Sequence, residues 1–203
     1  MRNDKIDDEG NEINLNFGGN DYIKVNSITI RNYNVFLDGE IGDSSEYREL
    51  RHILNTATEN DFVTMYINSV GGNLYTALGI IEAMKRSQAK IHSIVEGECM
   101  SAATIILLNS DEISICDSAA LMIHSAHYGA IGSTNNVKGQ ADFVAKMWKE
   151  LEKKTYTAFL TDKEIDSVSA GAEIYLNASD TKKRLKKWAE WKNNHKVKLK
   201  TEE

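Results

Sequence analysis

The stretch FVTMYINSVGGNLYTALGIIEAMKR, residues 62–86, predicts a strand, a glycine-containing turn and a helix in immediate succession. Residues 62–67 are apolar and include β-branched and aromatic side chains, as expected of a buried strand. In the segment that follows, Gly71 and Gly72 permit a tight turn and let the backbone approach a ligand closely. Residues 74–86 then continue as a helix. A strand–turn–helix unit of this kind favours an α/β fold.

The same alternation continues on both sides of this unit. Strands are expected at 34–37, 91–95, 112–116 and 121–124, and helices at 45–57, 102–108 and 137–160. Most of the strands are apolar on both faces, which is typical of parallel strands buried on both sides of a sheet. The last helix is long and amphipathic, so it either packs on its own sheet or projects to meet a partner.

The bulk composition sets further limits. The chain has 203 residues, of which 41% are hydrophobic and 27% charged, enough for one domain with a sizeable core. Its net charge of −6 argues against broad nucleic-acid binding. No apolar run reaches the length of a membrane span and the charged start is unlike a signal peptide, so we expect a soluble, cytoplasmic protein. Cys99 and Cys116 lie in apolar stretches without a CxxC pair and are expected to be reduced and buried.

The two ends differ from the middle in composition. Residues 1–28 are polar and are predicted to form an extension or a short hairpin, followed by a main domain at 29–181. Residues 182–203 form a basic tail, with nine bases and one acid between Lys182 and Lys200. This pattern is typical of a solvated helix with a frayed end, and contact with an acidic partner is the alternative. Trp188 is part of an apolar stripe in this tail that would dock on the core or on a neighbouring subunit.

Ser101 is the first candidate for chemistry. It lies among small residues between a predicted strand and a predicted short helix. At such a place the free N–H groups and the dipole of the helix favour negative charge. A nucleophilic serine needs this environment, because its attack on a carbonyl creates an oxyanion. The same segment, taken alone, also describes an ordinary N-capping serine.

His124 is the second candidate. It ends the predicted strand 121–124, at the sheet edge where α/β proteins build their sites. Its near-neutral pKa suits it to accept a serine proton and to return that proton to a leaving amine. A structural histidine is the alternative for this residue taken alone. The remaining histidines have no comparable setting: His52, His92, His127 and His195.

Three segments in this order resemble the proteolytic subunit of Clp proteases. The family pattern is I-N-S-P-G-G, then G-x-x-A-S-x-x-A/G, then M-I-H, and the matching segments here are 67–72, 97–103 and 122–124. The interval from Gly72 to Ser101 also agrees with the family. The resemblance covers residues 33–180 and implies a Clp protease/crotonase-like fold of repeated β-β-α units with a projecting long helix.

The resemblance also implies an activity and an assembly. The chain would be a serine endopeptidase that works through an acyl-enzyme on peptide or protein substrates, with Ser101 as nucleophile and His124 as general base. No metal or organic cofactor is needed. Members of the family assemble as homo-oligomers of stacked rings, and residues 137–160 would form the contact between rings.

The remaining site residues follow from position in the family pattern. The family's third catalytic residue is an aspartate before an L-S-A-like stretch, and Glu173 matches it before Leu176-Asn177-Ala178. Glutamate can orient an imidazole, although its extra methylene demands a shifted backbone. Asp166 is the reserve candidate. The oxyanion hole would be formed by the backbone N–H groups of Gly72 and Ala102.

Two departures from the family bear on partners. The start of the chain lacks the apolar segment that lines the axial pore and engages an unfolding ATPase, which argues against such a partner. The stretches 160–165 and 171–173 look more like the Clp-type proteases of tailed bacteriophages, some of which process head proteins during capsid assembly. The expected location is therefore the cytoplasm of a bacterium or of a phage-infected host.

Two other functions remain as alternatives. A catalytically silent, Clp-like structural subunit is compatible with glutamate in place of aspartate at position 173. An acyl-CoA hydratase or isomerase of the related crotonase fold also uses paired backbone N–H groups as an oxyanion hole, but it does not need serine and histidine at these two positions.

Overall fold

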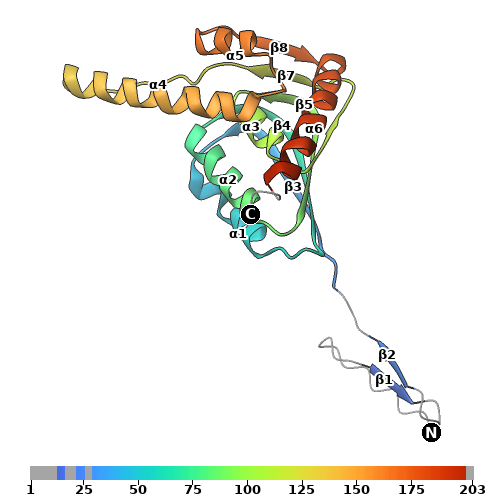
Figure 1. The fold of residues 1–203 in the computed structure, drawn as a ribbon. Helices are drawn as coiled ribbons and strands as arrows, with labels where there is room; N and C mark the ends of the chain where they lie inside the picture. Colours follow the sequence, from blue (N-terminus) through green and yellow to red (C-terminus); the bar gives the residue numbers. More distant parts are fainter. Residues whose placement is uncertain (1–12, 17–21, 26–28, 200–203) are drawn as a thin grey trace.

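The computed structural model describes residues 13–16, 22–25 and 29–199, and it contains one six-stranded mixed sheet (Figure 1). The strands of this sheet are β3 (Asn32–Ile41), β4 (Phe62–Gly72), β5 (Lys90–Met100), β6 (Glu112–Ile115), β7 (Ala120–Ile123) and β8 (Ile174–Asn177). The order is β3-β4-β5-β7-β8, with β6 also paired to β5. All pairs are parallel except β7 with β8. The predicted α/β class is confirmed.

Three helices cover one face of the sheet: α1 (Arg48–Thr56), α2 (Leu74–Arg86) and α3 (Ala102–Leu108). Against them β4 buries Val63, Met65 and Ile67 completely. The opposite face of β3 and β4 is more open, since Phe36 is 65% exposed and stacks on Tyr66 with ring centroids 5.0 Å apart. The expected burial of the strands on both faces is therefore wrong for this part of the sheet. Both faces of β4 carry apolar or aromatic side chains, so the sequence does not show that burial alternates along β4.

The predicted turn at 68–73 is instead the end of a longer strand. Strand β4 continues to Gly72, and β5 continues through Gly97 to Met100. Between them, the Asn68 side chain accepts a hydrogen bond from the backbone N–H of Glu98 (3.0 Å). A Cβ at position 97 would lie 2.4 Å from Asn68 Oδ1, so only glycine leaves room for this amide. Beyond this point the register of β5 on β4 shifts, with Cys99 opposite Ser69, and Glu98 to Met100 also pair with β7, which brings the ends of three strands together.

A short 3₁₀ helix, η1 (Ser44–Tyr47), precedes α1. Asp43 caps it, with its side chain accepting from the N–H of Ser45 (2.8 Å) and Glu46 completing a capping box. At the start of α2, the Asn73 side chain accepts from the N–H of Thr76 (3.1 Å). Both helices therefore begin at residues whose side chains satisfy free backbone donors.

The long helix α4 (Thr134–Tyr156) starts and ends earlier than the predicted 137–160. Its first half projects from the body of the molecule, and Phe143 in that half is 64% exposed (Figure 1). Its second half packs on the core through buried Trp148 and Tyr156. The helix α5 (Asp162–Ser169) follows as a separate element. Each of the two alternatives for the long helix therefore holds for one half: the second half packs on the core, and the first half projects.

Ala158 separates α4 from α5 and has a positive φ of 67°, a conformation that costs an L-residue about 1–2 kcal/mol. We expect Ala158→Gly to raise the free energy of unfolding by about 0.5–1 kcal/mol, because glycine removes this strain but makes the unfolded chain more flexible. Chemical denaturation measures the change. The matched control, Ala189→Gly at an exposed position, should instead lose about 1 kcal/mol of helix stability. Equal losses in both variants would contradict the prediction.

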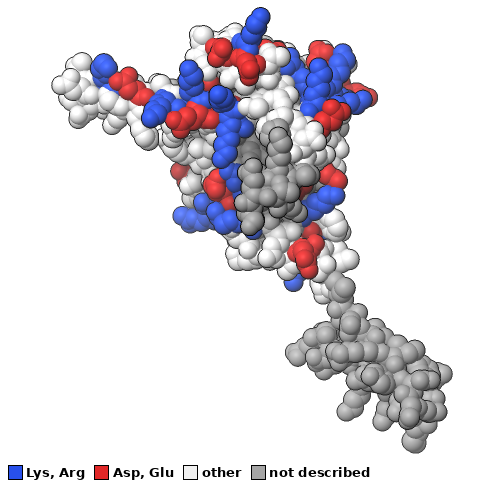
Figure 2. Space-filling model, in the orientation of Figure 1, with Lys and Arg blue, Asp and Glu red and all other residues white. Residues whose placement is uncertain are grey.

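The C-terminal helix α6 (Ala178–Leu199) docks on the core. Trp188 is buried, and Arg184 forms a bidentate ion pair with Glu164 of α5 at 2.7 and 2.9 Å. Hydrogen bonds from Arg184 lower the pKa of Glu164 to about 2. Basic and acidic side chains are interspersed on the face that carries α6 (Figure 2).

The polar N-terminal segment contains β1 (Ile13–Asn16) and β2 (Tyr22–Val25), which pair antiparallel as a hairpin. The rest of the predicted extension 1–28, and residues 200–203 of the tail, lie outside the described residues. Within the described part of the chain no helix is long and apolar enough to cross a membrane.

The two cysteines differ in environment. Cys99 is buried in β5 as predicted, and Cys116 is exposed, so the prediction that it is buried is wrong. The reason is local: β6 ends at Ile115, and Cys116 already belongs to the connection that leads to β7.

Candidate active site

Ser101 lies between the end of β5 and the start of α3, in a strained turn. Its φ of 52° and ψ of −124° are sparsely populated for any residue except glycine. Its N–H donates to the carbonyl of Met122 in β7 (2.8 Å), and its own carbonyl accepts from the Thr104 hydroxyl (2.7 Å). Its side chain makes no capping hydrogen bond to the described helix α3. A helix cap therefore does not explain this serine.

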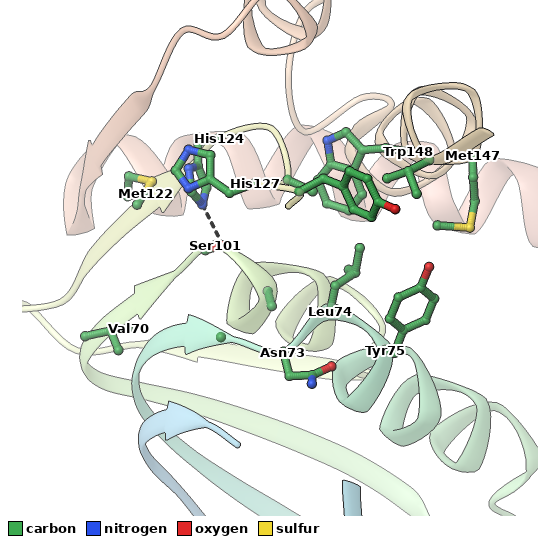
Figure 3. A pocket seen from close by; sticks show the side chains of 15 residues that line it. Val70, Asn73, Leu74, Tyr75, Ser101, Met122, His124, His127, Met147 and Trp148 are labelled. Atoms are coloured by element: carbon green, nitrogen blue, oxygen red, sulfur yellow. Dashed lines mark hydrogen bonds between the residues drawn. The ribbon is translucent and has the colours of Figure 1, made fainter. Parts of the chain in front are cut away.

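His124 follows β7 directly and faces Ser101. Its Nε2 atom lies 2.7 Å from Ser101 Oγ (Figure 3). The pKa of His124 is lowered, first because burial disfavours the charged ring and second because His127 is close. The two imidazole rings meet edge to face, with centroids 4.9 Å apart. A lowered pKa keeps His124 neutral near pH 7, the form in which it can accept a proton.

Glu173 stands opposite His124 across the β7–β8 pair. Ile123 pairs with Ile174 in this antiparallel ladder, so the next residues in register are His124 and Glu173. The negative charge of Glu173 raises the pKa of His124, against the two larger effects. Glu173 Oε2 accepts a hydrogen bond from the Tyr175 hydroxyl (2.6 Å). No hydrogen bond joins Glu173 to His124 in the described part of the chain.

Asp166, the reserve candidate, lies on an exposed turn of α5. Its backbone carbonyl accepts from the N–H of Ala170, where α5 ends. Within the described residues its carboxylate makes no hydrogen bond or ion pair with His124. The structure thus brings Glu173, and not Asp166, next to the imidazole.

Two glycines support the serine turn from β4. Gly71 has a φ of 86°, and a Cβ there would lie 2.5 Å from the Met100 carbonyl oxygen and 2.7 Å from Ser101 Cβ. Gly72 has a φ of 143°, and its Cβ would lie 2.4 Å from the carbonyl oxygen of Ile41. Both positions exclude every other residue, for lack of space as well as for backbone conformation. The strand can therefore approach Ser101 closely.

A cleft of about 400 Å³ opens in front of Ser101 and His124. Its walls are mainly apolar, with Leu74 and Tyr75 on α2 and Met147 and Trp148 on α4 facing each other across it (Figure 3). Gly72 and Ala102, the positions expected to supply oxyanion donors, also line this cleft. The arrangement places the hydroxyl of Ser101 in the lining of a cleft that suits an apolar side chain.

Several residues of the site were not singled out in the sequence. His127 has no distinctive setting in the sequence, although it lies three residues after His124 and its ring contacts that of His124. Tyr175 is two residues after Glu173, and the strand period of two places both on one face. The contact between Glu173 and Tyr175 could be inferred from the sequence only if residues 174–177 were recognised as a strand. The described residues contain no group of three or more histidine, cysteine or acidic side chains placed to hold a metal ion.

Comparisons with known proteins agree with this site. The family model described as Clp protease matches residues 18–184. The chain is 26% identical to ATP-dependent Clp protease proteolytic subunit 1 of Prochlorococcus marinus subsp. pastoris over 161 residues, which cover 77% of this chain and 81% of that protein. It is 29% identical to the ATP-dependent Clp protease proteolytic subunit of Bacteroides thetaiotaomicron over 124 residues, or 59% and 56% of the two chains. The residues matched by the family model include all three motif segments and the strands of the six-stranded sheet. The chain belongs to the Clp protease family.

Proposed function

We propose that this protein is a serine endopeptidase whose nucleophile is Ser101 and whose general base is His124. The observation that carries the proposal is the 2.7 Å contact between Ser101 Oγ and His124 Nε2, at a strained turn that opens into the cleft. An uncharged imidazole with its proton on Nδ1 accepts the serine proton through Nε2. Membership of the family supports the same activity.

The residues suggest the following sequence of steps. Ser101 Oγ attacks the peptide carbonyl carbon while its proton passes to His124 Nε2. The N–H groups of Gly72 and Ala102 bind the oxyanion that forms. The C–N bond then breaks, His124 gives its proton to the leaving amine, and an ester to Ser101 remains. Water, activated by the same imidazole, hydrolyses this ester and restores the serine. Glu173 stabilises the imidazolium that forms in both halves.

Members of the Clp protease family form oligomeric rings and act on protein substrates. We propose that this chain assembles in stacked rings, with the projecting half of α4 at the contact between rings, because exposed Phe143 lies there. The relatives are named ATP-dependent. The argument against an ATPase partner for this chain rests on residues 1–19, of which 13–16 are among the described residues. A role in processing phage head proteins stays a prediction.

A fluorophosphonate probe tests the activity directly. The purified, assembled protein is treated with the probe and digested, and the modified residue is located by tandem mass spectrometry. We expect a single adduct on Ser101, together with cleavage of a fluorogenic peptide. If the assembled protein forms no adduct even at alkaline pH, the catalytically silent subunit becomes the better description. The observation that favours that alternative is that Glu173 and His124 share no hydrogen bond among the described residues, while Glu173 is bonded to Tyr175.

The lowered pKa of His124 predicts a particular pH dependence. The base must be neutral to act, so the labelling rate should rise with pH as the imidazole loses its proton. Because burial and His127 lower the pKa, half of the maximal rate should be reached below pH 6.5, the ordinary value for histidine. Labelling rates between pH 4.5 and 8 measure this midpoint. The rates at acidic pH are used only after sedimentation confirms that the assembly is intact there. A midpoint above 6.5 would contradict the assignment.

Glu173 and Asp166 are distinguished by neutral, isosteric changes. We expect Glu173→Gln to lower kcat/KM by about 10²–10³-fold, because the amide no longer stabilises the imidazolium. Tyr175→Phe should cost only a few-fold, since it removes one orienting hydrogen bond to Glu173. Asp166→Asn serves as the matched control and should retain wild-type kinetics. If Asp166→Asn shows the large loss and Glu173→Gln does not, the two roles are reversed.

A further inference from the structure

Glu152, in the packed half of α4, is a buried carboxylate with one unsatisfied oxygen. The side chain is 1% exposed, and its Oε2 accepts a hydrogen bond from the Ser169 hydroxyl at 2.5 Å, at the end of α5. Its Oε1 is buried and has no hydrogen-bond partner among the described residues. Burial of an unpaired acceptor on a charged group is costly, so this oxygen calls for a donor that the described residues do not supply.

Glu152 lines a cavity of about 510 Å³ that adjoins the catalytic cleft. The two spaces share Ala126, Tyr128, Val144 and Trp148 as common wall. Ala141 and Ala145 are exposed residues of α4 that also line the cavity, so it is open to solvent on that side. Because the two spaces share these walls, a peptide bound in the cleft lies next to this cavity.

The polar groups around this cavity indicate what it would take. Glu152 is the only acidic side chain among its described lining residues. The indole N–H of Trp148 is also buried without a partner in the described part of the chain, so a donor and an acceptor both stand unused one helical turn apart. Lys149 lines the same cavity but is exposed and forms no ion pair with Glu152 among the described residues.

We propose that this cavity is a substrate subsite for a lysine or arginine side chain, held by a charge-assisted hydrogen bond to Glu152 Oε1. A cation satisfies both the charge and the free lone pairs of the carboxylate, and the ring of Trp148 offers a second favourable contact for it. The free indole N–H can donate to a carbonyl of the same peptide. The inference rests on the proposed endopeptidase activity and adds to it a preference for a basic residue near the scissile bond.

The preference is measured by digesting a mixture of synthetic peptides and identifying the cleavage sites by mass spectrometry. In the wild type, lysine or arginine should be enriched at one fixed position relative to the cleaved bond. For a peptide with lysine there, Glu152→Gln should lower kcat/KM by about ten- to a hundredfold. For the same peptide with norleucine in place of lysine, kcat/KM should stay unchanged. Glu150→Gln, an exposed neighbour on α4, is the matched control and should keep the basic preference.

The other outcomes decide against the subsite. Cleavage without any basic preference, or an equal preference in Glu152→Gln, overturns it while leaving the endopeptidase intact. If Glu152→Gln changes the oligomeric state measured by analytical ultracentrifugation and leaves the preference unaltered, the carboxylate pairs with a second copy of the chain instead. Loss of the preference in Lys149→Gln would show that Lys149, and not the Glu152 carboxylate, determines the substrate preference. If the wild type neither cleaves peptides nor forms a Ser101 adduct, the proposed endopeptidase function itself is wrong.

Discussion

Replacing His124 by alanine is expected to lower kcat/KM for peptide hydrolysis by about 10⁴-fold or more, because among the described residues it is His124 that is hydrogen-bonded to Ser101 Oγ and can accept its proton. The loss should appear mainly in kcat, since the apolar walls that bind the peptide are unchanged. Fluorophosphonate labelling of Ser101 should slow by a similar factor, and its remaining rate should no longer show a midpoint below pH 6.5. Steady-state kinetics and labelling rates on the assembled protein measure both effects.

The control for this change is His52→Ala. His52 is an exposed residue of α1 outside the cleft, so its loss should leave kcat/KM and the labelling rate as in the wild type. Circular dichroism and sedimentation show whether each variant is folded and assembled. A folded His124→Ala variant that is labelled at the wild-type rate would mean that Ser101 does not rely on this imidazole.

Gly71→Ala should damage both the site and the fold. The added Cβ would lie 2.5 Å from the Met100 carbonyl oxygen and 2.7 Å from Ser101 Cβ, and the backbone at φ 86° disfavours any side chain. Strain and overpacking together should lower the free energy of unfolding by about 2–5 kcal/mol. Because Ser101 must move, kcat/KM should fall by about 10²-fold or more, even in molecules that remain folded.

Gly139→Ala provides the matched control. Gly139 lies in α4, and a Cβ there meets no atom within 4 Å. Alanine is the better helix former, so this variant should gain about 1 kcal/mol of stability. Because the projecting half of α4 is proposed to form the ring contact, its activity is compared after sedimentation shows the wild-type assembly, and it should then equal that of the wild type. Denaturation curves and kcat/KM, measured side by side on the two variants, test the contrast. If Gly71→Ala matches Gly139→Ala in activity, the close contact between β4 and the serine turn is not needed for catalysis.

The elements that follow a regular apolar period were predictable. The helix at 74–86 agrees with the structure at both ends. The predicted strand 112–116 is one residue too long, and the predicted strand 121–124 is displaced by one residue. The extents of β4 and β5 were not predictable, because they depend on the Asn68 side chain reaching the backbone of Glu98. Contacts between residues so distant in sequence leave no trace in local periodicity.

The site was predictable to a similar degree. The three motif segments predict that Ser101, His124 and the paired glycines belong to one site. In the structure, Ser101, His124 and Gly72 line one cleft. What the sequence left open was the surroundings of each group. The hydroxyl that holds Glu173 comes from Tyr175, whose face could be assigned only after the strand was known. The unpaired oxygen of Glu152 results from the packing of α4 against α5, which no sequence pattern describes.

The unequal environments of the two cysteines provide a built-in attachment point for probes. Burial raises the pKa of the Cys99 thiol and keeps it unreactive, while Cys116 is open to solvent. With only two cysteines in the chain, a maleimide dye or spin label should attach once per subunit without any mutagenesis. Resonance energy transfer between such labels would report how copies are spaced, and would follow the exchange of subunits in real time.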